Sequence, residues 1–284
     1  IPNLDATSVV TSSTVRKAPA AGGANMVFGP GGFGQGPKIS HADAGMARLA
    51  SSRVLREGIS AISSEPTQIS VLHELIQLCV NKMGSLRGNQ LQVIMIEISH
   101  LLSTLGEAAA SSLDDLLPVF DKTLRHADHG VRHETAVACA AMTSIFPSEG
   151  RKLVVESINS IQLEHAELIT LASTKKVEDA SDSTIQSRFR FRRSAPTKEV
   201  KVDESLKHQY AIHGLALAVS MIIRDLPSLP GGLPVETLDT AMSVSEILTS
   251  SFHNDVMTNN NPSAACTSVR AGFGIISGVL ATGP

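Results

Sequence analysis

The fold of this chain is most constrained by one stretch, LDDLLPVFDKTLRHADHGVRHETAVACAAMTSIFP, which occupies residues 113–147. Apolar residues recur at helical spacing in its first half, a short turn carries Asp128, and a second amphipathic run begins at Val131. This order predicts two antiparallel helices. Such a pair is too small to bury its own apolar face, so neighbouring pairs must stack on it. The stretch therefore predicts a protein of layered helices and points away from catalysis.

Comparable patterns lie on both sides of this stretch. A helix is predicted from Ser40 to about Ile62, and Pro66 begins the next one. Residues 91–105 read as a helix covered on both sides, and Pro147 is predicted to begin a further pair that extends to Leu171. Long helices follow over residues 206–226, 235–252 and 264–281.

These helices predict the architecture. The pairs recur at roughly 40 residues, which is the spacing of HEAT and armadillo repeats. We predict an all-α fold, an α-solenoid of HEAT/armadillo-type antiparallel helix pairs, with about four to five pairs over residues 39–284. The chain begins at Ile1 and stops just after a helical run. We therefore expect a piece of a longer protein.

Two segments interrupt the helical pattern. Residues 1–38 are rich in Ser, Gly and Pro and are predicted to be a flexible linker. Their GPGGFG motif, residues 29–34, has the spacing of a dinucleotide-binding loop but lacks the flanking strand and helix, so no cofactor is expected. Residues 175–204 are predicted to be a disordered insertion. Its RFRFRR run is a solvated loop, an import signal, or a contact for an acidic protein, lipid headgroups or RNA. The residues of this run are Arg188, Phe189, Arg190, Phe191, Arg192 and Arg193.

Composition supports packed helices in a reducing compartment. Hydrophobic residues make up 42% of the chain and aromatic residues only 3%, which favours packing by Leu, Ile, Val, Met and Ala. The net charge of -3 gives no reason to expect nucleic acid. Cys79, Cys139 and Cys266 lie far apart in apolar helical runs and are predicted to be buried thiols of a cytoplasmic protein. The run at residues 211–223 is too short to span a bilayer and reads as a buried helix.

The central turn carries the candidate site residues. His126, His129 and His133 cluster there, and the i,i+4 spacing of the last two could supply zinc ligands. No Cys lies near them in sequence and the zinc-protease glutamate is missing, so we expect turn histidines and no metal site. Asp128 is predicted to cap the second helix, and Arg132 to reach a neighbouring repeat in a ladder of charged hydrogen bonds. Because no nucleophile with a base can be named, the chain is predicted not to be an enzyme and to have no small-molecule substrate.

The C-terminal third resembles a known family. SLKHQYAIHGLALAVSMI at residues 205–222 and SVRAGFGIISGVLATGP at residues 268–284 are similar to the HEAT-repeat-containing protein five family, and VRHETAVACAAMTSIFP at residues 131–147 supports the match. The resemblance implies a long cytosolic α-solenoid that acts as a non-enzymatic scaffold in clathrin-adaptor traffic between the trans-Golgi network and endosomes. It also implies repeat-packing roles for the matching positions, which are Val131, Arg132, Glu134, Cys139, Arg270, Ala271, Gly272, Phe273 and Gly283.

Taken with this resemblance, the sequence predicts a protein-binding scaffold in vesicle-mediated transport. Its expected partners are clathrin-adaptor components, and its expected location is the cytoplasm, with peripheral association at trans-Golgi and endosome membranes through those partners. One alternative is a regulatory or nuclear-transport scaffold of the same architecture. Another is an all-α enzyme, which would need a deep polar pocket that gathers His126, His129 and His133 with carboxylates.

Overall fold

A computed structural model describes residues 63–181, 204–225 and 232–282, together with seven positions between Met46 and Gly58. The described residues are almost entirely helical and include no strand, which confirms the all-α prediction. The predicted linker at residues 1–38 and the arginine-rich run at residues 188–193 lie outside the described residues. The helix predicted between Ser40 and Ile62 is described only at the seven positions, and all of them are helical.

The first two fully described helices are α2 (Glu65–Lys82) and α3 (Gly88–Leu105). Pro66 lies in the first turn of α2, as predicted, where its missing N–H costs no hydrogen bond. The predicted apolar stripe of α2 is buried at its centre, at Leu72, Ile76 and Cys79, whereas Val80 is exposed. Helix α3 has seven buried residues, which lie on one side of the helix. It ends at Gly106, whose φ of +57° begins the short helix η2 (Gly106–Ser112).

The predicted helix pair of residues 113–147 is present as α4 (Leu113–Leu124) and α5 (His129–Ile145). Asp128 is the N-cap of α5, because its side-chain carboxylate accepts the N–H of Gly130 at 2.8 Å. Val131 and Cys139 are fully buried on α5, and Phe120 and Leu124 are fully buried on α4. The cap and the two apolar stripes together explain why the sequence predicted this helix pair correctly.

Residues 147–181 form one helix, α6 (Pro147–Ser181), of 35 residues, so the prediction of a second pair here is wrong. Its buried positions recur at alternating steps of four and three without a break, at Val154, Ile158, Ile161, His165, Leu168 and Ala172. No Gly or Pro follows Gly150 within the helix, so nothing in the chain imposes a turn. The predicted insertion is also corrected at its start, because the backbone is helical up to Ser181.

The C-terminal part contains α7 (Glu204–Asp225), α8 (Val235–Ser250), η4 (Ser251–His253), α9 (Asp255–Asn260) and α10 (Pro262–Leu280). The predicted bounds of α7, α8 and α10 hold within two residues, and the predicted buried character of residues 211–223 is confirmed. The short α9 was not predicted. It is polar and six residues long, and Asn254 caps it by accepting the N–H groups of Val256 and Met257.

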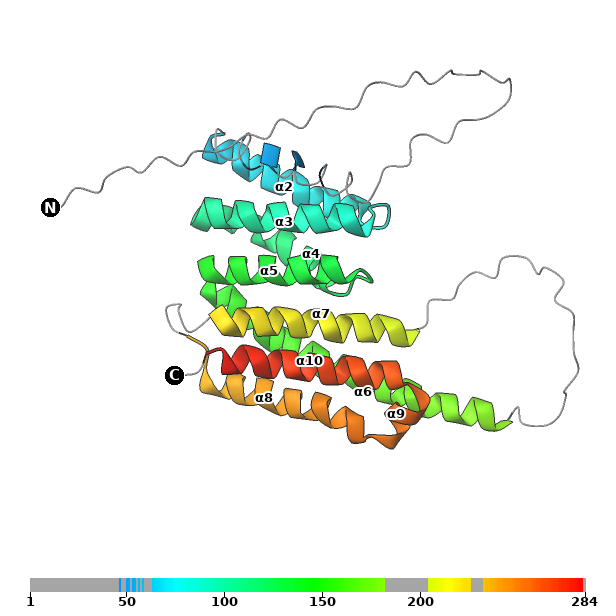
Figure 1. Cartoon of the computed structure of the whole chain (residues 1–284). Coiled ribbons are helices and arrows are strands. Elements are labelled where there is room, and N and C mark those ends of the chain that lie inside the picture. The colour runs from blue at the N-terminus through cyan, green and yellow to red at the C-terminus, as the bar shows by residue number, and fades with distance from the viewer. Residues whose placement is uncertain are drawn as a thin grey trace, which may run out of the picture. The chain divides into compact units, whose positions relative to one another are not determined.

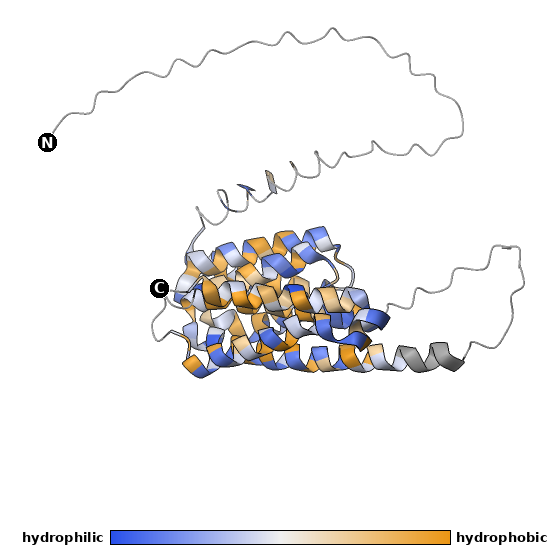
Figure 2. Ribbon diagram, turned by 60° about the horizontal axis from the view of Figure 1, so that its bottom comes forward, coloured by the Kyte–Doolittle hydropathy of each residue, from blue (hydrophilic) through white to orange (hydrophobic). Residues whose placement is uncertain are grey.

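Four helices pack one after another in a row, in the order α3, α5, α7 and α10. All four begin on the same side of the view in Figure 1, so they run parallel to one another. Helices α4, α6 and α8 connect successive members of this row, α2 precedes its first member, and all four pack against the row. Figure 2 shows that the hydrophobic residues of both sets lie mainly where helices face each other. The core therefore lies between the row and its connecting helices.

Glycines allow several of these helices to approach closely. A Cβ added at Gly214 of α7 would overlap the carbonyl oxygen of Leu124 at the end of α4. A Cβ at Gly272 of α10 would come within 2.8 Å of the carbonyl oxygen of Ser245, and one at Gly278 within 2.6 Å of that of Ser220. Helix α7 is thus held between α4 and α10 at distances that only glycine permits.

Two helical stretches, Gly88–Leu124 and Pro262–Leu280, are long and apolar enough to cross a membrane by length and composition alone. Both have a face buried against other helices, at Met95 and Leu102 in the first and at Ala271 and Ile275 in the second. Core helices pass the same test, so the two stretches are weak evidence for a membrane span.

Candidate functional site

Side chains from α5, α7 and α10 meet at the N-terminal end of α5. We call this group the imidazole–arginine cluster, and it consists of His129, Arg132, His133, Tyr210, His213 and Arg270. The sequence pattern had singled out the residues of α5 and Arg270, but as unrelated positions. Helix packing brings His213, which lies 81 positions after Arg132, into contact with it.

Arg132 lies at the centre of the cluster and is only 6% exposed. Its Nη1 donates to the carbonyl oxygens of His126 at 2.6 Å and Ala127 at 2.8 Å, and its guanidinium lies 5.0 Å from the ring centre of Tyr210. Its Nε donates to Nδ1 of His213 at 3.4 Å. Arg132 therefore contacts the neighbouring helix α7 through an imidazole and an aromatic ring.

The three histidines of the cluster lie beside one another. The ring of His129 is 5.0 Å from that of His213 and 6.4 Å from that of His133, measured between ring centres. Burial, followed by the charges of Arg132, His129 and Arg270, lowers the pKa of His213 to about 4. Burial and the same two arginines also lower the pKa of His129. At neutral pH both rings are therefore uncharged.

His126, His129 and His133, which were weighed as zinc ligands, are not gathered into one group. Within the described ranges, no group of three or more His, Cys, Asp or Glu side chains is arranged to hold a metal ion. His126 turns away from the other two, because its Nδ1 accepts the N–H of Asp128 at 3.0 Å. Burial lowers the pKa of His126, the charge of Asp128 raises it, and the charge of Arg132 lowers it further.

Arg270 and Phe273 were expected to pack between repeats, and this expectation is wrong for both. Arg270 is exposed and Phe273 is 60% exposed, because both lie on the face of α10 that points away from α7 and α8. The face of α10 that packs carries smaller residues, including Ala271, Gly272 and Gly278. Cys266, expected to be buried, lies on the same exposed face, whereas Cys79 and Cys139 are buried as predicted.

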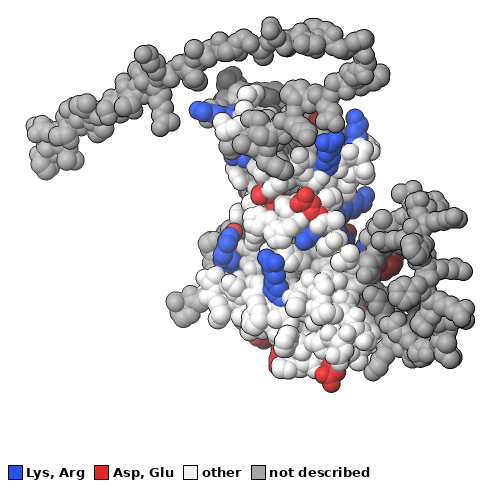
Figure 3. Space-filling view, turned by 45° about the vertical axis from the view of Figure 1, so that its right-hand side comes forward, with Lys and Arg blue, Asp and Glu red and all other residues white. Residues whose placement is uncertain are grey.

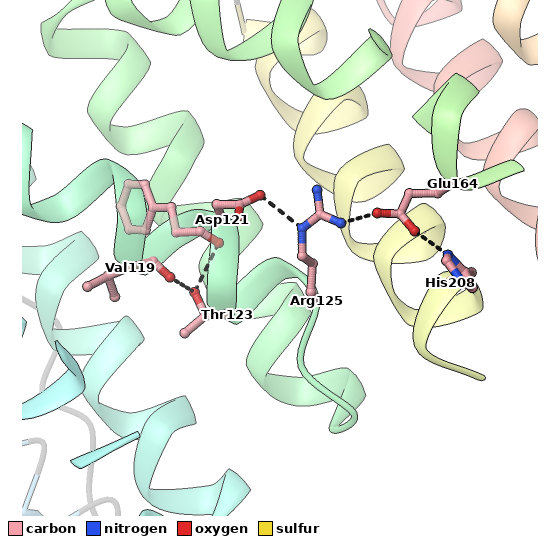
Figure 4. Close-up of polar contacts among 7 residues, drawn as sticks. Val119, Asp121, Thr123, Arg125, Glu164 and His208 are labelled. Carbon is pink, nitrogen blue, oxygen red and sulfur yellow. Dashed lines mark hydrogen bonds and ion pairs between the residues drawn. The ribbon is translucent and has the colours of Figure 1, made fainter. Parts of the chain in front are cut away.

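A second polar group lies on the other side of the α4–α5 turn, and we call it the carboxylate–arginine network (Figure 4). Arg125, the C-cap residue of α4, donates from Nε to Asp121 at 3.0 Å and from Nη1 to Glu164 of α6. The other oxygen of Glu164 lies 2.5 Å from Nδ1 of His208 on α7. Hydrogen bonds and the charges of Asp121 and Glu164 raise the pKa of Arg125 despite its burial. In this network each cationic group has a carboxylate partner.

Sequence reasoning did not single out Arg125, Glu164 or His208. Each is an ordinary polar residue in an amphipathic helix, and no spacing relates them along the chain. For the imidazole–arginine cluster, His213 was a usable signal in the sequence. A histidine inside a long apolar run needs a polar partner when it is buried.

Three surface cavities lie away from both polar groups. One of about 240 Å³ lies between α6 and α8 and is lined by His165, Ile169 and Ile247 among others. His165 shares a hydrogen bond of 2.7 Å with the hydroxyl of Ser251, and both side chains are at least 95% buried. Cavities of about 170 and 330 Å³ lie between α6 and α8 and between α2 and α3, and both have more apolar than polar lining.

No family model, curated protein or solved structure matches this chain. The fold and the two polar groups define an all-helical protein in which a row of parallel helices carries a cationic, imidazole-rich cluster on its surface. Its function has to be inferred from that row and that surface.

Proposed function

We propose that this chain is part of a non-enzymatic protein-binding scaffold, built as an α-solenoid of HEAT or armadillo type. The observation that carries the proposal is the row of parallel helices α3, α5, α7 and α10, each of which packs on the next. Rows of this kind create long continuous surfaces, and repeat proteins use such surfaces to bind other proteins. An extended surface of this type holds a partner through many spaced contacts.

The details of the row support this proposal. The α4–α5 pair has its capping Asp128 and its buried arginine at the turn, and α7 is fitted against that turn through Gly214. Large apolar side chains remain exposed on the last helices, at Phe252, Phe273 and Leu280. Exposed apolar side chains of this size favour contact with further protein.

We further propose that the partners are components of a clathrin adaptor that acts between the trans-Golgi network and endosomes. The support is the resemblance of residues 131–147, 205–222 and 268–284 to the HEAT-repeat-containing protein five family. On this proposal the chain works in the cytoplasm and reaches membranes through its partners.

The test is direct binding between the purified 284-residue chain and a purified trans-Golgi clathrin-adaptor complex, measured by biolayer interferometry. We expect saturable binding to the adaptor complex and none to a protein phosphatase catalytic subunit or to a nuclear transport cargo. Binding to the phosphatase or the cargo in place of the adaptor would overturn the adaptor assignment and favour a regulatory or nuclear-transport scaffold.

A further inference from the structure

We propose that the face formed by the imidazole–arginine cluster and the exposed stripe of α10 is a docking site for an acidic protein segment, in which an Asp or Glu lies two positions from a large apolar residue. This inference rests on the proposed scaffold function and names the chemistry of one of its partners.

The first observation is that two arginines, Arg270 on this face and Arg132 buried beneath it, have no carboxylate bound to them among the described residues. Arg132 uses its N–H groups on two carbonyls and an imidazole, so no carboxylate neutralises it directly. Arg270 is exposed, is the one charged residue of α10, and has no carboxylate partner within the described ranges. The carboxylates nearest the cluster are Asp128, which caps α5, and Glu134, which lies 3.4 Å from His133. An anionic partner would supply the missing negative charge.

The second observation is that the charge is surrounded by uncharged surface. In Figure 3, charged side chains are sparse over the part of the view where α10 lies. Helix α10 has no Asp or Glu at all. A carboxylate that approaches Arg270 along α10 would therefore meet no like charge, which favours association with acidic segments over basic ones.

The third observation is the position of Phe273 relative to Arg270. The two residues are three positions apart on one helix, so their side chains are neighbours on the same exposed face. Phe273 is 60% exposed and could bury much of its ring under an apolar side chain of a partner. In an extended peptide, side chains two positions apart lie about 7 Å apart on one side. An acidic residue and an apolar residue at that spacing fit Arg270 and Phe273 together.

A protein segment fits this face better than a nucleic acid does. Binding to nucleic acid draws on several Lys and Arg side chains that follow the phosphate backbone. Here Arg270 is the only fully exposed cation of the cluster, and an apolar ring lies beside it. The cationic group and the ring together match the acidic and apolar residues of a peptide.

The experiment measures binding of a fluorescein-labelled peptide of about twelve residues to the full chain by fluorescence anisotropy. The peptide repeats Glu-Ser-Leu-Ser, so that each acidic residue lies two positions from a leucine on the same side of the extended chain. Arg270→Ala should weaken binding about tenfold or more, since it removes a hydrogen bond between charged groups. Phe273→Ala should weaken binding by about tenfold, since it removes a buried ring. Added salt should weaken binding of the wild-type chain.

The matched control is Arg224→Ala, which removes the same charge from an exposed arginine in the last turn of α7 that pairs with Asp225. We expect this variant to bind within about twofold of the wild type, because only long-range charge is lost. A peptide with Asn and Gln in place of Asp and Glu should not bind. Circular dichroism of each variant checks that the helices are intact.

Three results would overturn the proposal. They are equal loss of binding in Arg270→Ala and Arg224→Ala, equal binding of the acidic and the amide peptide, and tighter binding of a single-stranded RNA that depends on Arg270.

The adaptor measurement separates this inference from the scaffold proposal. Suppose that Arg270→Ala binds the adaptor complex as tightly as the wild type does, and that the acidic peptide does not bind the wild-type chain. The docking site is then wrong and the scaffold proposal stands. If the peptide binds through Arg270 and the adaptor complex does not bind, the docking site stands and the adaptor assignment is wrong.

Discussion

The two polar groups beside the α4–α5 turn both contain arginine and histidine but differ in charge balance. In the carboxylate–arginine network, Asp121 and Glu164 neutralise Arg125, and Glu164 also holds His208 (Figure 4). In the imidazole–arginine cluster, Arg132 is held by carbonyls and rings, and Arg270 is exposed. A balanced group connects helices and has little charge left for a ligand, whereas an unbalanced group can attract one. The charge balance of each group therefore distinguishes the structural network from the candidate binding surface.

The largest effect is expected where both groups depend on one contact, the fit of Gly214 against the carbonyl of Leu124. Gly214→Ala should destabilise the chain by about 3 kcal/mol, because the added methyl group overlaps backbone that cannot move freely. Urea denaturation followed by circular dichroism measures the free energy of unfolding. The matched control is Gly274→Ala, where an added Cβ has nothing within 4 Å. This control should be neutral or stabilising by up to about 1 kcal/mol. Equal loss in both variants would contradict the close packing of α7.

The next effect separates the two groups. Glu164→Gln leaves Arg125 and His208 without their shared carboxylate. It should lower the free energy of unfolding by roughly 1–2 kcal/mol, because Glu164 is partly shielded from solvent at 16% side-chain exposure. Acidic-peptide binding should not change.

Arg270→Ala is the converse of this variant. It should change the free energy of unfolding by less than about 0.5 kcal/mol, because the side chain is exposed. Peptide binding should fall as described above. If Glu164→Gln abolished binding while Arg270→Ala destabilised the fold, the distinction between the groups would be lost.

A smaller effect is expected in the pH dependence of stability. The pKa of His213 is about 4 in the folded chain, below the ordinary value of 6.5, and Arg132, His129 and Arg270 face it from α5 and α10. The unfolded chain therefore binds more protons between pH 6.5 and 4, so stability should fall as the pH falls through that window. His213→Gln keeps an acceptor for Arg132 and should flatten part of this slope. His129, His126 and His165, whose pKa values are also lowered, account for the remainder. Parallel curves for the wild type and the variant would contradict the assignment.

The smallest perturbation tests whether the face of α10 is open. Cys266 lies on this face, one turn before Arg270, while Cys79 and Cys139 are buried. Burial raises the pKa of the Cys79 thiol to about 11 and that of the Cys139 thiol further. A maleimide reagent at neutral pH should therefore modify one thiol in the folded chain and three after denaturation. Mass spectrometry counts the additions, and rapid labelling of all three in the folded chain would show that the packing is wrong.

Much of the local structure could be predicted from sequence. The α4–α5 pair followed from a capping Asp128 and two apolar stripes, and the starts of α2, α6 and α10 followed from Pro66, Pro147 and Pro262. The error at α6 has the same origin, because a repeat length of about 40 residues was imposed on a stretch that contains no helix breaker. Helix α9 was missed because six polar residues carry no periodic signal.

The candidate site was predictable only in part. His129, Arg132, His133 and Arg270 were all noted, but for metal binding or repeat packing, and His213 was noted only as part of a buried helix. Which of them meet depends on the rotation of α5, α7 and α10 about their axes, and close contacts at glycines fix that rotation. Arg270 and Phe273 were predicted to pack between repeats. A sequence pattern does not show which side of an apolar helix is covered by other helices.

Three properties follow from the sequence alone: the helical character of the chain, the bounds of most helices, and the capping of α5 by Asp128. Each depends on residues within a few positions of each other. Only the tertiary structure decided that Arg132 meets His213 and Tyr210, that Glu164 joins Arg125 to His208, and that Phe273 and Arg270 face outward. These contacts join residues up to 81 positions apart. They are set by how closely whole helices can approach, which the spacing of residues along one helix does not encode.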